Sequence, residues 1–277
     1  MSQPSERAMR IAEEITRRTT CNHYRLVLNE ERMPAITDSK IGGIPYWPAD
    51  KPFPIDDHGE KMLFLMQIHC EQAGLAYPLP EHGMLQWFIS INPDNMYGCQ
   101  GNYDEGSGFK IIYHDQIDEC PAPEGIPTHD SVDDMLTPVK REVAIDVVNE
   151  ETAMGMNDGH FNDLFFEIVK EITGVEQTEK MWYEYLDNDD CLYFEKDLGM
   201  KRPRHQMLGY PVYSQEEARR DINCHDTLLF QLDSQFSSLD RKELVMWGDM
   251  GSGFVFINHE DLAALDFTRA YYCWDCG

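Results

Sequence analysis

The chain has 277 residues, of which 42% are hydrophobic and 11% aromatic, and its 50 acidic residues outnumber 23 basic ones to give a formal net charge of −27. A field of that sign repels phosphate backbones, so the composition argues against nucleic-acid binding and favours a basic protein as partner. The hydrophobic content is that of a folded chain rather than a disordered acidic tail, so the charge must lie on the surface.

The sequence shows no signal for export or membrane insertion. The first twenty residues carry charges throughout, and nowhere do about 18 apolar residues run together. Eight cysteines are scattered over the chain, a pattern that predicts reduced thiols rather than a disulfide framework. We therefore expect a cytoplasmic protein that does not act at a membrane.

Two segments have the apolar spacing of amphipathic helices. Apolar residues within 8–15 recur at intervals of three to four positions after Ser5. This spacing predicts a helix that Ser5 caps and that continues to about Arg18. The same spacing over 161–172, with Gly174 placed for a left-handed C-terminal residue, predicts a second helix.

Two shorter helices are predicted from capping residues. Ser214 followed by Glu217 forms a capping-box pattern, which predicts a short helix through Arg219. Asn258 is predicted to cap another short helix that contains Leu262.

Strands dominate the rest of the chain. Compact apolar runs bounded by Gly, Pro, Asp or Asn predict six of them. They are Met62 to Ile68, Met84 to Ile91, Phe109 to His114, Val143 to Val148, Thr227 to Leu232 and Phe254 to Ile257. The fold class expected is mainly β with flanking helices, an α+β fold.

Blocks of residues recur in the same order in two parts of the chain. The proposed equivalents are Gly43 and Gly209, Pro45 and Pro211, Gln67 and Gln231, and Gly83 and Gly251. Ordered blocks with similar gaps predict an internally duplicated β-sheet core. The predicted organisation is an N-terminal helix and lead-in strand (1–37) followed by a single domain (38–277), whose repeats (about 38–98 and 205–277) flank a connecting insertion (99–204).

Seven short motifs resemble the YwqG-like family, bacterial proteins grouped as a domain of unknown function. The motifs are Ser39 to Pro48, Phe64 to Ile68, Gly83 to Ile89, Leu208 to Pro211, Leu228 to Ser234, Trp247 to Ile257, and Asp266-Phe267 with Asp275-Cys276. The resemblance implies a β-dominated, duplicated fold, and it supplies no catalytic residues. Some relatives are proposed as immunity proteins that neutralise bacterial toxins, which makes that role an expectation here.

A terminal pair of cysteines has the spacing of half a metal site. Cys273 and Cys276 are separated by two residues, as in thiolate pairs that share zinc. A structural zinc needs four ligands, and Cys191 or Cys224 with His225 would have to come close through folding. The alternative is two inert cysteines in a terminal strand.

The recurring polar residues offer a second candidate site. Gln67 and Gln231 lie inside apolar strands, where they must find hydrogen-bond partners, and so they are expected to pin backbone loops. The functional alternative is a cleft that these residues line together with Trp47, Asp233, Trp247 and Asp249. Tryptophans would supply apolar contact there, and carboxylates would bind a basic ligand or a metal.

Three functions remain open from the sequence. The leading hypothesis is an acidic protein-binding module that captures a basic protein, and its more specific form is a toxin-neutralising immunity factor. The second is a metal-dependent enzyme or small-ligand receptor that uses Asp233, Asp249 and either His225 or His259. The third is a structural interaction module. We expect no cofactor and lean against an enzyme, because no complete catalytic or cofactor motif occurs in the sequence.

Overall fold

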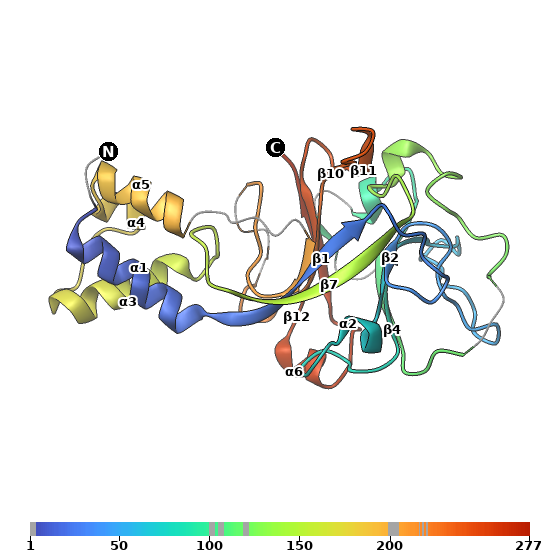
Figure 1. The fold of residues 1–277 in the computed structure, drawn as a ribbon, viewed down its shortest axis with the longest axis horizontal. Helices are drawn as coiled ribbons and strands as arrows, with labels where there is room; N and C mark the ends of the chain where they lie inside the picture. The colour runs from blue at the N-terminus through green and yellow to red at the C-terminus, as the bar shows by residue number, and fades with distance from the viewer. Residues whose placement is uncertain are drawn as a thin grey trace.

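The computed structural model describes residues 4–99, 103–104, 108–118, 122–198, 205–215, 217, 219 and 221–277. The molecule is elongated: a helical lobe lies at one end and a β body at the other, and the long strands β1 (Cys21–Asn29) and β7 (Val143–Thr152) connect them (Figure 1). The chain enters the lobe first, crosses to the β body through β1, and returns to the lobe through β7.

The helical lobe consists of α1 (Glu6–Thr19), α3 (Phe161–Thr173), α4 (Trp182–Tyr185) and α5 (Asn188–Asp197). Both predicted long helices are confirmed. The Ser5 hydroxyl accepts the Ala8 N–H at 3.1 Å, and Gly174 ends α3 with a φ of 71°. The apolar stripes of α1 and α3 face each other and bury a core of their own, separate from the core of the β body.

The β body is built around one antiparallel sheet in the order β5-β13-β12-β9-β8-β1-β7-β2-β3-β4-β6. The strands besides β1 and β7 are β2 (Lys40–Ile41), β3 (Leu63–His69), β4 (Met84–Ile89), β5 (Tyr103–Asp104), β6 (Phe109–His114), β8 (His205–Leu208), β9 (Thr227–Asp233), β12 (Ser252–Ile257) and β13 (Tyr271–Asp275). All six predicted strands are present, so the expected mainly β fold class is confirmed. The sheet is nearly closed, because the Phe109 ring of β6 lies 5.3 Å from the Tyr272 ring of β13.

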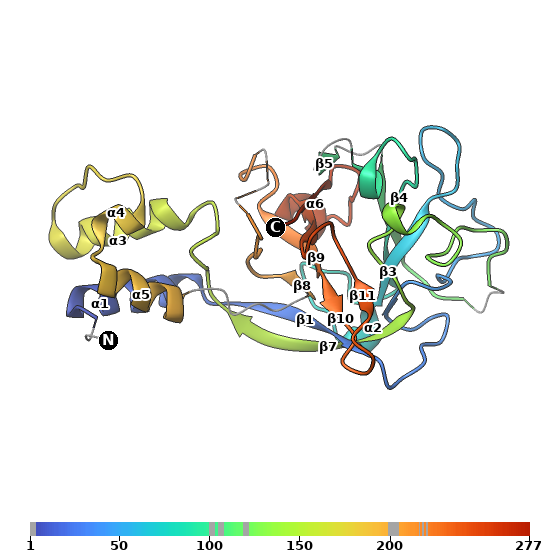
Figure 2. The same ribbon diagram turned by 90° about the horizontal axis from the view of Figure 1, so that it is seen from above.

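Short elements complete the β body. They are α2 (Cys70–Ala73), α6 (His259–Ala263), a second small sheet of β10 (Gln235–Phe236) and β11 (Glu243–Val245), and the 3-10 turns Met96–Gly98 and Asp134–Leu136 (Figure 2). The predicted cap of α6 is confirmed, since the Asn258 side chain accepts the Glu260 N–H. Among the residues that the structure describes, no helix is both long and apolar enough to cross a membrane.

The helix predicted to open at Ser214 is not found in the described residues of that segment, which are bent or without regular structure. Other partners, one distant in sequence and two local, take the groups that a capping box would use. The Ser214 N–H donates to the Asp275 carboxylate at 2.6 Å, and the Glu217 carboxylate accepts from the Tyr213 hydroxyl and the Arg219 guanidinium.

The two predicted repeats belong to one sheet rather than to two lobes, and β1 and β7 lie between them. β1, from the predicted lead-in, pairs with β7 over nine residues and with β8 on its other edge. β6 and β7, from the predicted insertion, are likewise members of the sheet. The division into repeats and insertion stays a prediction.

The proposed equivalent glutamines make the same backbone contact. The Gln67 Oε1 accepts the Tyr46 N–H at 2.9 Å, and the Gln231 Oε1 accepts the Val212 N–H at 3.1 Å. Each side chain therefore fixes the segment that follows its own glycine-proline block.

The proposed equivalent glycines share a close backbone approach. A Cβ atom on Gly83 would lie 2.0 Å from the His114 carbonyl oxygen, and one on Gly251 would lie 1.7 Å from the Asp275 carbonyl oxygen. Only glycine permits either contact. These paired contacts support the predicted duplication, which stays a prediction.

Candidate functional site

Gln67 and Gln231 are completely buried and use their amides within the protein. The Gln67 Nε2 donates to the Ile36 and Asp38 carbonyl oxygens at 2.7 and 2.8 Å. The Gln231 Nε2 donates to the Asp233 carboxylate at 2.8 Å. Both side chains pin backbone loops, as the architectural interpretation predicts.

The two candidate tryptophans lie in different clusters. Trp47 packs among Phe53 and Phe88 at one side of the sheet. Trp247 lies in the main core of the β body, stacked on Trp87 with ring centroids 5.9 Å apart. The structure therefore does not bring them together at one cleft.

The candidate acids also differ in their surroundings. Asp233 is buried, and its N–H donates to the His205 Nδ1 at 3.0 Å, whereas Asp249 is exposed. His259 pairs with Asp226 at 2.6 Å. Within the described ranges, which include all of these residues and His225, no group of three or more His, Cys, Asp or Glu side chains is placed to hold a metal ion.

The terminal cysteines are both free thiols. Cys273 is buried in β13, and burial raises its thiol pKa well above the ordinary value, so a thiolate is disfavoured there. Cys276 is partly buried, Cys224 is exposed on the β body, and Cys191 lies in the helical lobe. The structure does not assemble these residues into a four-ligand set.

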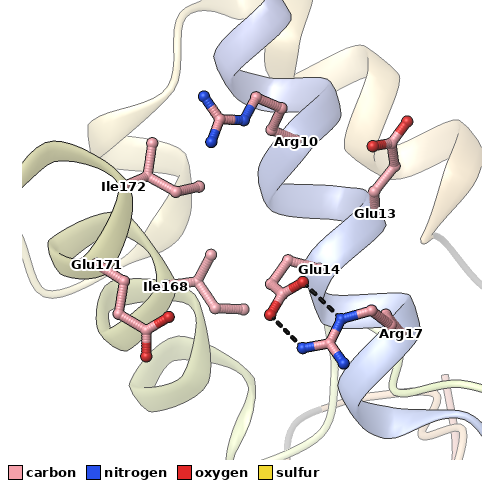
Figure 3. A pocket seen from close by; sticks show the side chains of 7 residues that line it. All are labelled: Arg10, Glu13, Glu14, Arg17, Ile168, Glu171 and Ile172. Atoms are coloured by element: carbon pink, nitrogen blue, oxygen red, sulfur yellow. Dashed lines mark hydrogen bonds and ion pairs between the residues drawn. The ribbon is translucent and has the colours of Figure 1, made fainter.

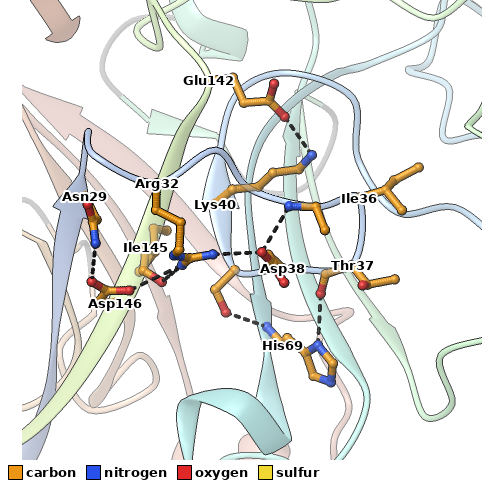
Figure 4. A network of polar contacts seen from close by, with 12 residues as sticks. Asn29, Arg32, Ile36, Thr37, Asp38, Lys40, His69, Glu142, Ile145 and Asp146 are labelled. Atoms are coloured by element: carbon orange, nitrogen blue, oxygen red, sulfur yellow. Dashed lines mark hydrogen bonds and ion pairs between the residues drawn. The ribbon is translucent and has the colours of Figure 1, made fainter.

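A polar network that the sequence did not reveal joins the segment after β1 to β7 and β3 (Figure 4). Arg32 pairs with Asp38 at 2.7 Å and with Asp146 at 3.3 Å. Lys40, only 2% exposed, donates to Glu142 at 2.8 Å. Because each buried charge has an opposite partner, this network holds the chain in place rather than presenting reactive groups.

A second buried network lies where the chain leaves β7 for the helical lobe. Arg219 donates to Glu217 at 2.7 Å, lies 3.7 Å from Asp158, and places its guanidinium 4.8 Å from the centre of the Phe256 ring. Burial raises the Asp158 pKa. Hydrogen bonds from Arg219 and Tyr213 outweigh burial at Glu217 and lower its pKa. Groups with shifted pKa values often mark functional sites, but here they bind one another away from solvent, and we assign them to holding the segment after β7 against the β body.

A groove of about 480 Å³ lies on the helical lobe between α1 and α3 (Figure 3). Ile168 and Ile172 line it between charged side chains. Glu14 accepts from Arg17 at 2.6 Å, and the hydrogen bonds from Arg17 and then Arg18 lower its pKa to about 2. Arg18 also pairs with Glu171 on the facing helix. The charges around this groove largely neutralise one another.

The segment that contains α3, α4 and α5 is strongly acidic. Residues 161–198 contain eleven acidic residues and three lysines. We name the exposed residues of α4, α5 and the turn between them the α4–α5 surface. It consists of Tyr183, Glu184, Asp187, Asn188, Asp189, Leu192, Glu195 and Lys196, so four acidic side chains and one basic side chain belong to it. Tyr183 and Leu192 are each 53% exposed, so this surface combines negative charge with apolar side chains. The sequence held the signal, because these acids fall in helical segments, but only the fold shows which side chains stay outside the core.

Comparison with known proteins identifies the family of the chain but assigns it no function. A family model described as a domain of unknown function, DUF1963, matches residues 39–276. No curated protein matches the sequence. The match includes the β body from β2 onward and the inserted helices, and α1 and β1 lie before it.

Proposed function

Since the chain belongs to the DUF1963 family, whose description names no reaction, we propose a function from its surface: an acidic protein-binding module that captures a basic protein. The observation that carries the proposal is the net charge of −27 on an ordered chain. Charge of this size speeds encounter with a basic partner and discourages association with acidic ones.

The helical lobe supports the proposal because its acids are fixed on folded elements. Phe165 and Phe194 are fully buried in the core of the lobe and hold α3 and α5 together, with ring centroids 5.8 Å apart. Carboxylates on a rigid support bind arginine or lysine with less loss of conformational entropy than those on a mobile tail.

A neutralising role is the finer form of this proposal. Clustered carboxylates compete for the arginines and lysines with which a basic protein holds phosphates, so a captured partner would lose access to nucleic acid. The YwqG-like resemblance, with its proposed immunity proteins, supports a toxin as one such partner.

The test is affinity capture from the native cell, with the tagged full-length chain as bait at low and at moderate salt. An unrelated folded protein of similar net charge serves as the control bait. We expect a partner of basic isoelectric point that this chain alone retains at moderate salt. Recovery of no basic partner at either salt, or the same proteins on both baits, would contradict the proposal.

A further inference from the structure

The α4–α5 surface has a rigid base. The Cys191 thiol of α5 contacts the carbonyl oxygens of Tyr183 and Leu186, each at 3.9 Å, so the two helices pack directly against each other. Below them the Trp182 ring stacks on the Phe194 ring, with centroids 5.9 Å apart. Tyr183 and Leu192 are therefore exposed on elements whose neighbouring residues are buried, rather than on a loose loop.

The N-terminus of α5 is tied to the start of the chain. The Asp190 carboxylate accepts from the Ser5 N–H and from the Ser5 hydroxyl, both at 2.7 Å. Leu192 lies on the opposite, exposed side of α5, together with Asp189 and Glu195 at helical spacings of three. One side of α5 is thus used for folding, and the other is left to solvent.

Three carboxylates of this surface have no ion-pair partner in the part of the chain that the structure describes. They belong to Glu184, Asp187 and Glu195. Glu184 accepts the Lys180 and Met181 N–H groups and Asp187 accepts the Asp190 N–H, which leaves their negative charge unpaired with a cation. Arg18 of α1 pairs with Glu167 and Glu171 of α3, whereas the Arg7 guanidinium lies 5.3 Å from the centre of the Tyr185 ring of α4 and forms no ion pair with Glu184, Asp187 or Glu195. In α5 itself, Lys196 is the single basic residue, and it is exposed beside Glu195, so the four carboxylates of the surface still outnumber its one cation.

Charge complementarity decides what can cover this surface. A second copy of the chain would bring another strongly acidic protein against it, which like-charge repulsion opposes. A basic segment would gain from the carboxylates, and apolar side chains on one of its faces would cover Tyr183 and Leu192.

We propose that the α4–α5 surface is the docking site for a basic amphipathic helix of a partner protein. This inference rests on the proposed function and assigns it to a particular part of the lobe. Tyr183 and Leu192 supply the apolar anchors, and Glu184 and Glu195 supply the charge that orients the partner.

The experiment uses the full-length chain and two labelled peptides of identical leucine and lysine composition. In the first peptide the leucines fall on one face of a helix, and in the second the same residues are ordered so that they do not. Fluorescence anisotropy measures both affinities at 0.15 M salt, the ionic strength at which long-range charge effects are screened within about 8 Å.

Variants locate the site. We expect Tyr183→Ala and Leu192→Ala each to weaken binding of the patterned peptide about tenfold, as truncation of an interface anchor does. Glu195→Gln should weaken it about threefold and reduce its dependence on salt. Leu239→Ala is the matched control, because Leu239 is an exposed leucine of the β body at 68% exposure, and its affinity should equal that of the unchanged protein.

The results separate this inference from the broader function. Tighter binding of the patterned peptide together with losses confined to the lobe variants supports the docking site. Equal binding of both peptides, or affinities of Tyr183→Ala and Leu192→Ala within twofold of the unchanged protein, overturns it, while a basic partner captured from cells would still uphold the proposed function. Circular dichroism of each variant excludes unfolding as the cause of any loss.

Discussion

The β body and the helical lobe use their polar residues in opposite ways. In the β body, Gln67, Gln231 and Asp233 are buried and hydrogen-bonded to neighbouring groups, so they hold the sheet and its loops in place. In the lobe, apolar stripes do the folding and most carboxylates face solvent. The residues that stand out in the sequence because they recur are thus architectural, and the surface that we propose for binding lies in α4 and α5, between them in the sequence.

We expect the largest effect on stability at Gly251, the residue just before β12. In Gly251→Ala the new methyl carbon would lie 1.7 Å from the Asp275 carbonyl oxygen, so β13 must move. We expect the free energy of unfolding to fall by about 3–5 kcal/mol. Chemical denaturation measures it. Gly155→Ala, where the nearest atom is 3.5 Å away, is the control and should change stability by less than about 0.5 kcal/mol. Equal stabilities for the two variants would show that the β body tolerates displacement there.

The equivalent glutamines give the next largest effect. Gln67→Leu leaves the Tyr46 N–H without its acceptor, and Gln231→Leu does the same to the Val212 N–H. We expect each variant to lose about 2–4 kcal/mol, since buried unsatisfied groups cost about 1–3 kcal/mol apiece. Similar losses, measured by urea unfolding, would sharpen the predicted duplication. A loss at only one of the two positions would count against it.

The pH dependence of the β body should reveal His114. Its Nε2 lies 3.1 Å from the Gln86 Oε1, and burial, followed by the nearby Lys51 ammonium, lowers its pKa from 6.5 to about 4. As the pH falls below 6.5 the unfolded chain takes up a proton that the folded chain refuses, so stability declines, by about 2 kcal/mol at pH 5.

The matched variant for this prediction is His114→Gln, which keeps a donor for Gln86 but cannot titrate. The difference in unfolding free energy between the two proteins should change by about 2 kcal/mol between pH 7 and pH 5. Parallel pH profiles for the two proteins would contradict the lowered pKa.

The smallest of these effects should stay within the helical lobe. Asp190→Ala removes the acceptor of the Ser5 N–H and hydroxyl, and we expect α1 to lose about 1–2 kcal/mol of local stability. Hydrogen exchange resolved by peptide should show faster exchange in α1 and α5 and unchanged rates in β3 and β9. Acceleration throughout the sheet would mean that the lobe and the β body unfold as one unit.

The sequence predicted those parts of the fold that depend on local pattern. The periodicity of 8–15 and 161–172 was sufficient for α1 and α3, and the apolar runs were sufficient for six strands. The helix at Ser214 was wrong because Asp275, distant in sequence, takes its N–H. β8, four residues long, depends on pairing with β1 and β9 rather than on its own pattern.

The candidate site could be predicted only in part, because local pattern does not determine which distant segments come into contact. The sequence identifies Gln67 and Gln231 as buried amides in need of partners, and the structure supplies those partners. It does not reveal that Trp47 and Trp247 enter separate clusters, because that depends on the order of strands in the sheet. Nor does it show that Tyr183 stays outside the lobe core, because helical spacing over four residues does not define a face.

The central claim is that a basic partner binds the α4–α5 surface and that the β body takes no part in the binding. Hydrogen exchange of the full-length chain, with and without the patterned peptide, tests this claim most directly. The account predicts slower exchange in α4 and α5 and unchanged exchange in β3, β4, β9 and β12. Slower exchange confined to the β body, or no change in α4 and α5 at saturating peptide, would contradict it.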